Sequence, residues 1–246
     1  MINIIDCLWY TKSTLWLLLL LFVWGCNQDD NINGNINDPI PTDGVIFNSN
    51  LSYGSVGDID GNVYKTIKIG SHIWMAENLK TTRYRNGDQI PNITDDQVWY
   101  NLSSGAYCNY LNELKYAQTF GRLYNYYAAI DSRNIAPAGW HVASDDEWLE
   151  LLEENNSLDL REVGTTHWTR FSAEYVTNNT GFTALPGGGR LISWKTSNYS
   201  LVEQVGFWWC TGNPDYPITH VCWDYTGMER NIENPKRGFS IRCVKD

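Results

Sequence analysis

The chain has 246 residues, and its 18 basic and 28 acidic side chains give it a formal net charge of −10. An acidic chain lacks the clustered cations that phosphate contacts require, so the composition argues against a nucleic-acid partner. Hydrophobic residues make up 43% of the chain and charged residues only 19%, which excludes a disordered polyelectrolyte and indicates a folded protein.

The first 25 residues have the features of an export signal. Residues 15–24 form an apolar run, LWLLLLLFVW, which is too short to span a bilayer as a helix but fits the hydrophobic region of a signal peptide. Gly25 and Cys26 then resemble the bacterial lipoprotein box, in which the cysteine is lipidated and begins the mature chain. We therefore predict a lipoprotein signal peptide over residues 1–25, a lipidated Cys26 and attachment to a membrane through that lipid. A plain secretory signal with an incidental cysteine is the alternative.

Residues 26–50 predict a flexible polar tether. This stretch is rich in Asn, Asp, Gly and Pro and has no hydrophobic periodicity, so it cannot bury enough apolar area to fold. Gln28, Asp29 and Asp30 resemble the surface-export signal of Bacteroidetes lipoproteins. We expect an outer-membrane lipoprotein that faces the cell surface, with the periplasmic face as the alternative.

The folded part begins with predicted β-structure. Residues 56–64 place an Asp60-Gly61 turn between two alternating runs, a pattern typical of a β-hairpin. Residues 64–69 alternate between apolar and polar side chains, and residues 73–75 follow as the next predicted strand.

One helix is predicted with particular clarity from Ser144 onward. Ser144 and Glu147 have the spacing of a capping box, in which each side chain binds the other's backbone N–H. Trp148, Leu151 and Leu152 then form one apolar stripe.

The other predicted elements are shorter. A second helix is expected over residues 112–127, or over the latter half of that range. Strand-like runs follow at residues 182–185, 206–211, 219–224 and 238–244. Few helices, short strands and much loop predict the α+β fold class.

Five sequence phrases occur in a characteristic order and spacing. They are residues 58–64 (DIDGNVY), 74–79 (WMAENL), 121–128 (GRLYNYYA), 135–142 (IAPAGWHV) and 238–246 (GFSIRCVKD). The series resembles the Fibrobacter succinogenes major paralogous domain, which is common in exported lipoproteins, and the resemblance covers residues 56–246. It implies one such domain over residues 51–246.

A more remote resemblance concerns the fold alone. Residues 139–148 (GWHVASDDEW), followed by the terminal phrase, are similar to the formylglycine-generating-enzyme and C-type-lectin-like folds. The similarity implies a single compact, loop-rich domain with small twisted antiparallel sheets and one or two helices. In such a fold the last strand returns to pair with the first. Fold resemblance does not fix function.

Cysteine usage predicts disulfides rather than a metal site. Removal of the signal and lipidation of Cys26 leave Cys108, Cys210, Cys222 and Cys243, an even number, which in an exported chain predicts two disulfides with three possible connectivities. We expect Cys210 to pair with Cys222, because both lie on neighbouring strand-like runs, and Cys108 to pair with Cys243. There is no Cys-x-x-Cys pair and the histidines are scattered, so no metal ligands and no cofactor are predicted.

Three smaller features have structural interpretations. Glu77 and Asn78 are expected to form a buried polar pair near the sheet. His141 is expected to be a core histidine with its hydrogen bonds satisfied rather than a catalytic base. The triple glycine at residues 187–189 is expected to mark a tight loop or close backbone packing.

The function that this pattern favours is binding without catalysis. Aromatic side chains gather near polar ones in one short stretch, as they do where proteins bind carbohydrate. The candidate ligand-binding residues are Trp208, Trp209, Asn213, Asp215, Tyr216 and Trp223. We predict a surface binding or adhesion protein that recognises glycan or a partner protein, and no catalytic residues are assigned. A thiol- or metal-dependent enzyme is the alternative, and a structural surface component is a further one.

Overall fold

The computed structural model describes residues 44–168, 175–193, 196–212, 216–223 and 227–246. All of them belong to one contact unit, Ile40–Asp246. The predicted signal peptide, Cys26 and most of the predicted tether lie outside the described residues. Within the described ranges, no helix is long and apolar enough to cross a membrane.

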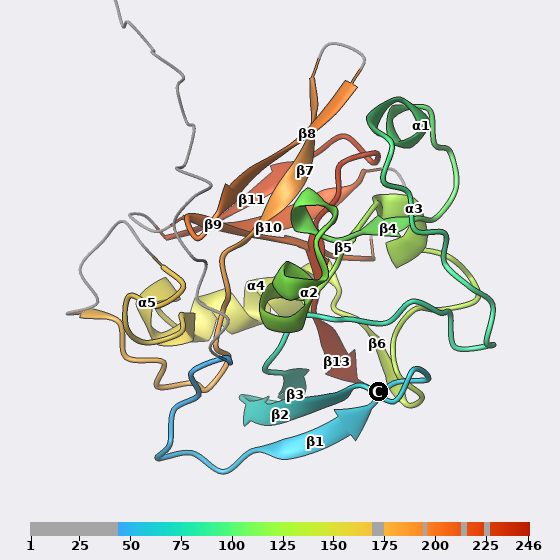
Figure 1. The fold of residues 1–246 in the computed structure, drawn as a ribbon. Helices are drawn as coiled ribbons and strands as arrows, with labels where there is room; N and C mark the ends of the chain where they lie inside the picture. The colour runs from blue at the N-terminus through green and yellow to red at the C-terminus, as the bar shows by residue number, and fades with distance from the viewer. Residues whose placement is uncertain (1–43, 169–174, 194–195, 213–215, 224–226) are drawn as a thin grey trace, which may run out of the picture. The chain divides into compact units, whose positions relative to one another are not determined.

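Five strands form the first sheet, at the bottom of Figure 1, in the order β1-β2-β3-β13-β6. All four pairings are antiparallel. The strands are β1 (Gly54–Gly57), β2 (Val63–Ile69), β3 (His72–Met75), β6 (Trp140–Val142) and β13 (Cys243–Lys245). The last strand of the chain therefore lies between an early strand and one from the middle of the chain.

The predicted hairpin is confirmed, and its turn is held by one carboxylate. Val56 lies opposite Tyr64 across β1 and β2. Asp58 accepts hydrogen bonds from the backbone N–H groups of Asp60 and Asn62, from the Asn62 side chain and from the Tyr64 hydroxyl, at 2.6–3.0 Å. These donors use the carboxylate, so the Asp-rich segment is a structural turn.

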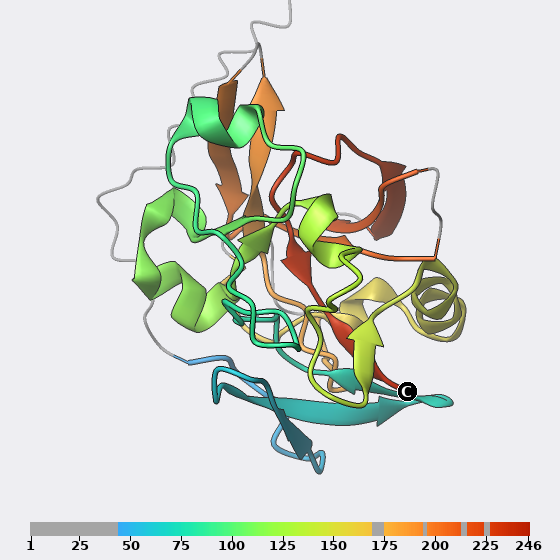
Figure 2. The same ribbon diagram turned by 90° about the vertical axis from the view of Figure 1, so that its right-hand side faces the viewer.

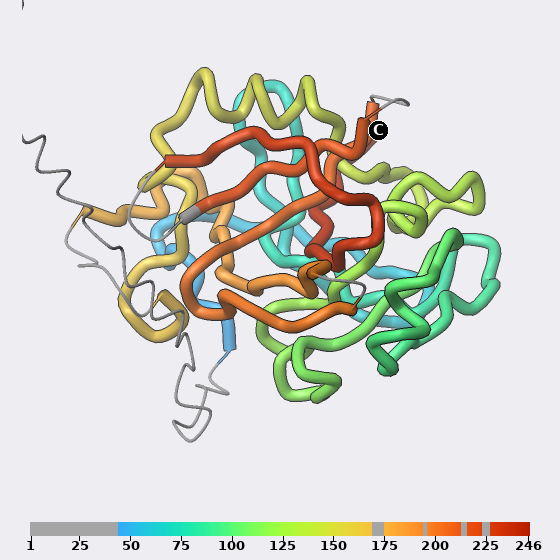
Figure 3. The backbone as a smooth tube through the Cα atoms, turned by 90° about the horizontal axis from the view of Figure 1, so that it is seen from above, coloured from blue at the N-terminus to red at the C-terminus, as the bar shows by residue number. Residues whose placement is uncertain are grey.

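The second sheet lies above the first in Figure 1 and is mixed. Its order is β11-β10-β9-β7-β8, and β12 pairs with β9. The strands are β7 (Gly187–Ser193), β8 (Thr196–Val202), β9 (Val205–Trp209), β10 (Ile218–Trp223), β11 (Met228–Ile232) and β12 (Ser240–Ile241). The β7–β9 and β12–β9 pairings are parallel, where the remote fold resemblance implied antiparallel sheets. Seen from above, the orange and red strands of this sheet lie in front of the blue and cyan strands of the first (Figure 3).

Short helices and a two-stranded ladder occupy the middle of the chain (Figure 2). They are α1 (Asp96–Tyr100), β4 (Tyr107–Cys108), the 3-10 turn η1 (Tyr110–Asn112), α2 (Leu114–Phe120), β5 (Leu123–Tyr124), α3 (Tyr126–Ala129), α4 (Asp145–Glu154) and α5 (Ser157–Leu160). The predicted capping box of α4 is confirmed. The backbone N–H of Ser144 donates to Glu147 at 2.8 Å, and that of Glu147 donates to Ser144 Oγ at 3.2 Å.

The helix predicted over residues 112–127 is wrong as one element, because Gly121 ends α2 and β5 separates α2 from α3. Gly121 has a φ of +79°, and a Cβ at this position would lie 2.6 Å from the Cβ of Asn78. Asn125 then caps α3 by accepting from the N–H of Ala128. Leu123 and Tyr126 are three residues apart, as neighbours on a helix face are, but Leu123 lies in β5 and Tyr126 begins α3.

The predicted close packing at the triple glycine is confirmed. These glycines open β7, and a Cβ at Gly189 would lie 2.8 Å from the ring of Phe239. Strand β7 therefore approaches the C-terminal segment more closely than any side chain would allow.

A buried hydrogen-bond network connects residues 74–79 with residues 238–246, two of the phrases on which the family resemblance depends. Arg242 is fully buried and donates from Nε to Asn78 Oδ1 at 2.6 Å, while its other nitrogens donate to three backbone carbonyls at 2.8 Å. Asn78 Oδ1 also accepts from the indole N–H of Trp208 at 2.8 Å. Burial lowers the pKa of Arg242 to about 9, against the opposing charge of Glu77. Glu77 and Asn78 are both buried, as predicted, and Glu77 accepts from the N–H of Lys65 at 2.7 Å.

The α+β fold class is confirmed. The expectation that the last strand pairs with the first is wrong. β13 pairs with β3 and β6, whereas β1 is an edge strand that pairs with β2. The C-type-lectin-like resemblance stays a prediction.

Candidate functional site

The predicted aromatic binding surface is wrong at its centre. Trp208 and Trp209 are 0% exposed, and their indole N–H groups donate to Asn78 Oδ1 and to the carbonyl of Tyr124. Both lie on β9, which has neighbours on both sides and is buried along its whole length, so neither ring can present a face to a ligand. Tyr216 is 53% exposed. Asn213, Asp215 and the side chain of Trp223 lie outside the described residues.

The predicted disulfide between Cys210 and Cys222 is incompatible with the strand register. The N–H of Cys210 donates to the carbonyl of Ile218, whereas Cys222 lies opposite Gly206, four residues farther along β10. Four strand residues span about 13 Å, and a disulfide needs Cα atoms within about 7 Å. The expectation came from the linear distance between two neighbouring strands, which does not fix where along them each cysteine lies.

Cys108 and Cys243 are not bonded to each other either, and all four described cysteines are buried thiols. Cys108 packs with Trp99 and Phe120, while Cys243 packs in a different part of the core, opposite Val142. Burial raises the pKa of Cys108, Cys210 and Cys243. A buried thiol with a raised pKa is a poor nucleophile, so these side chains are not suited to thiol catalysis.

We expect the four cysteines to resist alkylation in the native protein and to react completely after denaturation without any reductant. Iodoacetamide labelling followed by peptide mass spectrometry, residue by residue, measures both states. A sample reduced before denaturation is the control and should give the same four labelled positions. Disulfide-linked peptides that join Cys210 to Cys222 or Cys108 to Cys243 would contradict the structure.

One pocket, which we call the α3 pocket, has a volume of about 580 Å³. It lies between α3, the segment that follows it, the end of β6 and the residues just after β9. Its lining residues are Tyr126, Ala129, Ile130, Asp131, Ser132, Asn134, His141, Val142, Thr211 and Gly212. The pocket thus combines an aromatic and aliphatic wall with a polar rim.

The charges at the rim of this pocket are compensated. Arg133 donates to both carboxylate oxygens of Asp131 at 2.8–2.9 Å, and these bonds hold the pKa of Asp131 at about 2. Thr211 uses its hydroxyl hydrogen on the carbonyl of Val142 at 3.0 Å and keeps its oxygen as an acceptor. Asp131 therefore does not present an unpaired negative charge to the pocket.

His141 is satisfied by hydrogen bonds, as predicted, but it is not a core residue. Its Nδ1 lies 2.7 Å from an oxygen of Asp246, its Nε2 lies 2.9 Å from an oxygen of Glu147, and its side chain is 37% exposed. Burial acts to lower the pKa of His141, but the hydrogen bonds with Asp246 and Glu147 outweigh it and raise the pKa above 6.5.

This raised pKa predicts a pH-dependent contribution to stability. A group whose pKa rises on folding stabilises the protein below its unfolded pKa, about 6.5, and loses that effect as pH rises through the folded value. We expect His141→Gln to be less stable than the wild type by up to about 1 kcal/mol at pH 6. The effect is small because His141 and its carboxylate partner Asp246 are partly exposed. The difference in the free energy of unfolding should shrink above pH 7. Urea unfolding of both proteins across this range measures it, and a constant difference would contradict the assignment.

A smaller pocket of about 280 Å³ lies beside the β1–β2 turn. Its polar walls are already used by the fold. Asp58 holds the turn, and Arg85 donates to the carbonyls of Ala136, Pro137 and Trp140. This pocket offers a ligand few polar groups.

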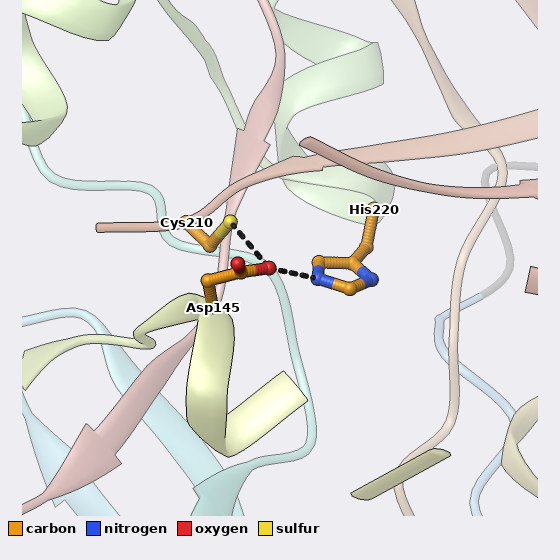
Figure 4. A group of neighbouring side chains, drawn as sticks. All are labelled: Asp145, Cys210 and His220. Atoms are coloured by element: carbon orange, nitrogen blue, oxygen red, sulfur yellow. Dashed lines mark hydrogen bonds and ion pairs between the residues drawn. The ribbon is translucent and has the colours of Figure 1, made fainter. Parts of the chain in front are cut away.

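A cluster of potential metal ligands, which we call the Asp-Cys-His cluster, comprises Asp145, Cys210 and His220 (Figure 4). One donor atom from each residue lies within 4.8 Å of the others. Asp145 Oδ1 is 3.1 Å from His220 Nε2 and 4.0 Å from Cys210 Sγ. Asp145 is the first residue of α4, Cys210 follows β9, and His220 lies in β10.

A guanidinium from the edge strand β11 also binds this carboxylate. Arg230 Nε lies 2.8 and 2.9 Å from the two Asp145 oxygens, and its NH2 lies 2.6 Å from Oδ2. Burial acts to raise the pKa of Asp145, but the bonds with Arg230 and His220 hold it below its ordinary value. Burial lowers the pKa of His220, so this ring is neutral at pH 7 and Arg230 supplies the compensating charge.

The sequence analysis missed this cluster. Cys210 was predicted only as half of a disulfide, and neither Asp145 nor His220 was assigned to a site. The three residues span 75 positions, so no local spacing could reveal the group. The one available signal was that Cys210 and His220 flank the loop between two predicted strands.

The family model of the Fibrobacter succinogenes major domain matches residues 67–245. No curated protein and no solved structure matches the chain. The matched range includes the α3 pocket and the Asp-Cys-His cluster.

Proposed function

The chain belongs to the Fibrobacter succinogenes major domain family, and we propose that it is an exported, lipid-anchored binding protein whose ligand occupies the α3 pocket. The proposal keeps the binding role expected from the sequence but moves the site away from the buried Trp208 and Trp209. The observation that carries it is the pocket itself, whose volume of about 580 Å³ is in the range of small-molecule sites.

The lining favours a neutral, polyhydroxylated ligand such as a saccharide unit. Sugar C–H groups pack on apolar surfaces, here that of the exposed Ile130, while hydroxyl groups bind polar side chains such as Ser132 and Thr211. Because Arg133 already neutralises Asp131, the rim does not demand a charged ligand. A partner protein would enter only by placing a single side chain or an attached glycan in the pocket.

The thiol-dependent enzyme alternative has less support. Thiol catalysis needs an exposed thiolate, whereas Cys108, Cys210 and Cys243 are buried and their pKa values are raised. The α3 pocket contains no cysteine.

Binding is tested with the detergent-purified full-length protein on a glycan array, followed by titration with the best glycan. Ile130 is 49% exposed at the pocket wall, and Ile232 is 60% exposed on β11. Ile130→Arg should weaken binding at least tenfold, and Ile232→Arg, the matched control, should leave it unchanged. Equal binding by both folded variants would place the ligand elsewhere, and a blank array would remove the saccharide class.

Export and anchorage are tested separately, since Cys26 and the signal lie outside the described residues. We expect metabolic labelling with a fatty-acid analogue to mark the wild type and not Cys26→Ser. Protease treatment of intact cells should degrade a surface-facing protein and spare a periplasm-facing one. A Cys26→Ser protein that is still labelled would contradict lipidation at this residue.

A further inference from the structure

We propose that Asp145, Cys210 and His220 form a binding site for one divalent metal ion of the Zn²⁺ class, with one coordination position left for a water molecule. The site lies next to the α3 pocket, because Cys210 directly precedes Thr211 and the backbone N–H of Asp145 donates to the carbonyl of Thr211 at 2.9 Å. The proposal does not depend on a ligand in that pocket. It rests on the types of the three donors, on their distances and on how Arg230 is placed around the carboxylate.

The donor set is one that Zn²⁺ and Co²⁺ prefer. A thiolate, an imidazole and a carboxylate are the side chains that bind these ions most often, and softer or harder ions prefer other combinations. Catalytic-type zinc sites have three protein ligands and an open fourth position, whereas structural sites are closed by four.

The distances are close to those that a bound ion needs. Bond lengths of about 2.0–2.3 Å place tetrahedral ligand atoms about 3.3–3.8 Å apart. Here Asp145 Oδ1 lies 3.1 Å from His220 Nε2 and 4.0 Å from Cys210 Sγ. Cys210 Sγ and the ligand nitrogen of His220 lie within 4.8 Å of each other. The side chains therefore need shifts of up to about 1 Å to surround an ion.

Arg230 and an ion can share the carboxylate. Oδ1 faces His220 and Cys210, while Oδ2 takes the 2.6 Å bond from the NH2 group of Arg230. An ion on Oδ1 would displace the bond from Nε to that oxygen and leave the bonds to Oδ2 in place. Arg230 then holds the ligand carboxylate in orientation from outside, as outer hydrogen bonds do at many metal sites.

His220 is fixed in a position that suits coordination. Its ring is fully buried and stacks on Trp148, with ring centres 5.1 Å apart and planes 13° apart. Its Nδ1 has no hydrogen-bond partner among the described residues, so the proton can move from Nε2 to Nδ1 when Nε2 binds the ion. Because that N–H gains no acceptor from the described chain, we expect affinity below that of zinc sites with a carboxylate behind the histidine.

Binding of one ion releases one proton from the site. The neutral His220 keeps one proton, now on Nδ1, and Asp145 is already ionised. The Cys210 thiol loses its proton to solvent as the metal–sulfur bond forms, so one proton is released for each ion bound.

The test uses Co²⁺ as the probe with full-length protein kept reduced. We expect one Co²⁺ per chain, a thiolate-to-cobalt charge-transfer absorption, the visible bands of four-coordinate cobalt, and loss of both when Zn²⁺ is added. Cys210→Ser should abolish the charge-transfer absorption and His220→Gln should weaken binding at least tenfold. Cys108→Ser, which removes another buried thiol whose pKa is raised, is the matched control and should bind as the wild type does.

Circular dichroism shows whether each variant is folded. If Cys210→Ser does not fold, the loss of binding in His220→Gln decides the test. Arg230→Gln should weaken Co²⁺ binding, because it removes the hydrogen bonds that orient the ligand carboxylate. No cobalt absorption in the wild type, or absorption only in Arg230→Gln, would overturn the proposal and leave a plain ion-pair cluster. Absorption retained in folded Cys210→Ser would overturn it as well.

Discussion

Asn78→Ala is expected to lower the free energy of unfolding by about 3–5 kcal/mol, because it removes the acceptor shared by two buried donors. Asn78 Oδ1 accepts from the fully buried guanidinium of Arg242 and from the indole of Trp208. The Nδ2 group of Asn78 donates to the carbonyl of Phe120 and to the hydroxyl of Ser240. Urea unfolding followed by circular dichroism measures the change.

The control for Asn78→Ala is Asn101→Ala. Asn101 is exposed at the end of α1, and its side chain donates to the carbonyl of Gln97. This variant should change the free energy of unfolding by less than about 1 kcal/mol, since water replaces the lost partner. If Asn78→Ala lowered the free energy of unfolding no more than Asn101→Ala does, the buried hydrogen-bond network would not stabilise the fold.

Gly121→Ala should destabilise the protein by about 1–3 kcal/mol more than Gly139→Ala does. The two glycines have nearly equal φ angles, +79° and +76°. A Cβ at Gly121 would lie 2.6 Å from the Cβ of Asn78 and 2.9 Å from the carbonyl oxygen of Leu79, whereas a Cβ at Gly139 meets no atom within 4 Å. Gly121 also has a ψ of −174°, a combination with positive φ that essentially only glycine adopts, so the difference between the variants contains a backbone cost and a steric cost.

Both glycine variants carry the conformational cost of a positive φ, at least about 1–2 kcal/mol. Thermal unfolding of the two proteins side by side measures the remaining difference. Equal melting temperatures would mean that α2 and the Asn78 segment can separate at little cost, which would contradict the close approach in the structure.

Local patterns in the sequence predicted the elements that local interactions determine. The α4 helix follows from Ser144 and Glu147, whose mutual bonds need no distant partner. The β1–β2 hairpin likewise follows from a turn that Asp58 closes within a few residues. Such features depend on side chains that are neighbours along the chain, so their spacing is sufficient evidence.

Features set by distant contacts could not be predicted in this way. Trp208 and Trp209 have the composition of a carbohydrate surface, and only the placement of β9 between β10 and β7 buries them. Gly121 interrupts a helical pattern because Asn78, far away in sequence, packs against it. The strand register that separates Cys210 from Cys222 depends on the pairing of β9 with β10.

The candidate sites follow the same rule. His141 was singled out by its place in a sequence phrase, and the structure places it at the rim of the α3 pocket. Thr211 and Gly212 reach the same pocket from the end of β9, nearly 70 residues later along the chain, as the separation of Thr211 from Val142 shows. A pocket that is assembled from two such segments leaves no pattern in either of them.

Hydrogen–deuterium exchange mass spectrometry of the full-length protein, with and without its best-binding glycan, tests the location of the binding site most directly. The account predicts slower exchange in peptides that cover residues 126–142 and 206–212, which line the α3 pocket. Peptides that cover β11, Met228–Ile232, should exchange at the same rate with and without the glycan. Protection confined to residues 213–223, with none in residues 126–142, would contradict this location. The binding site would then lie in the segment first predicted from the sequence.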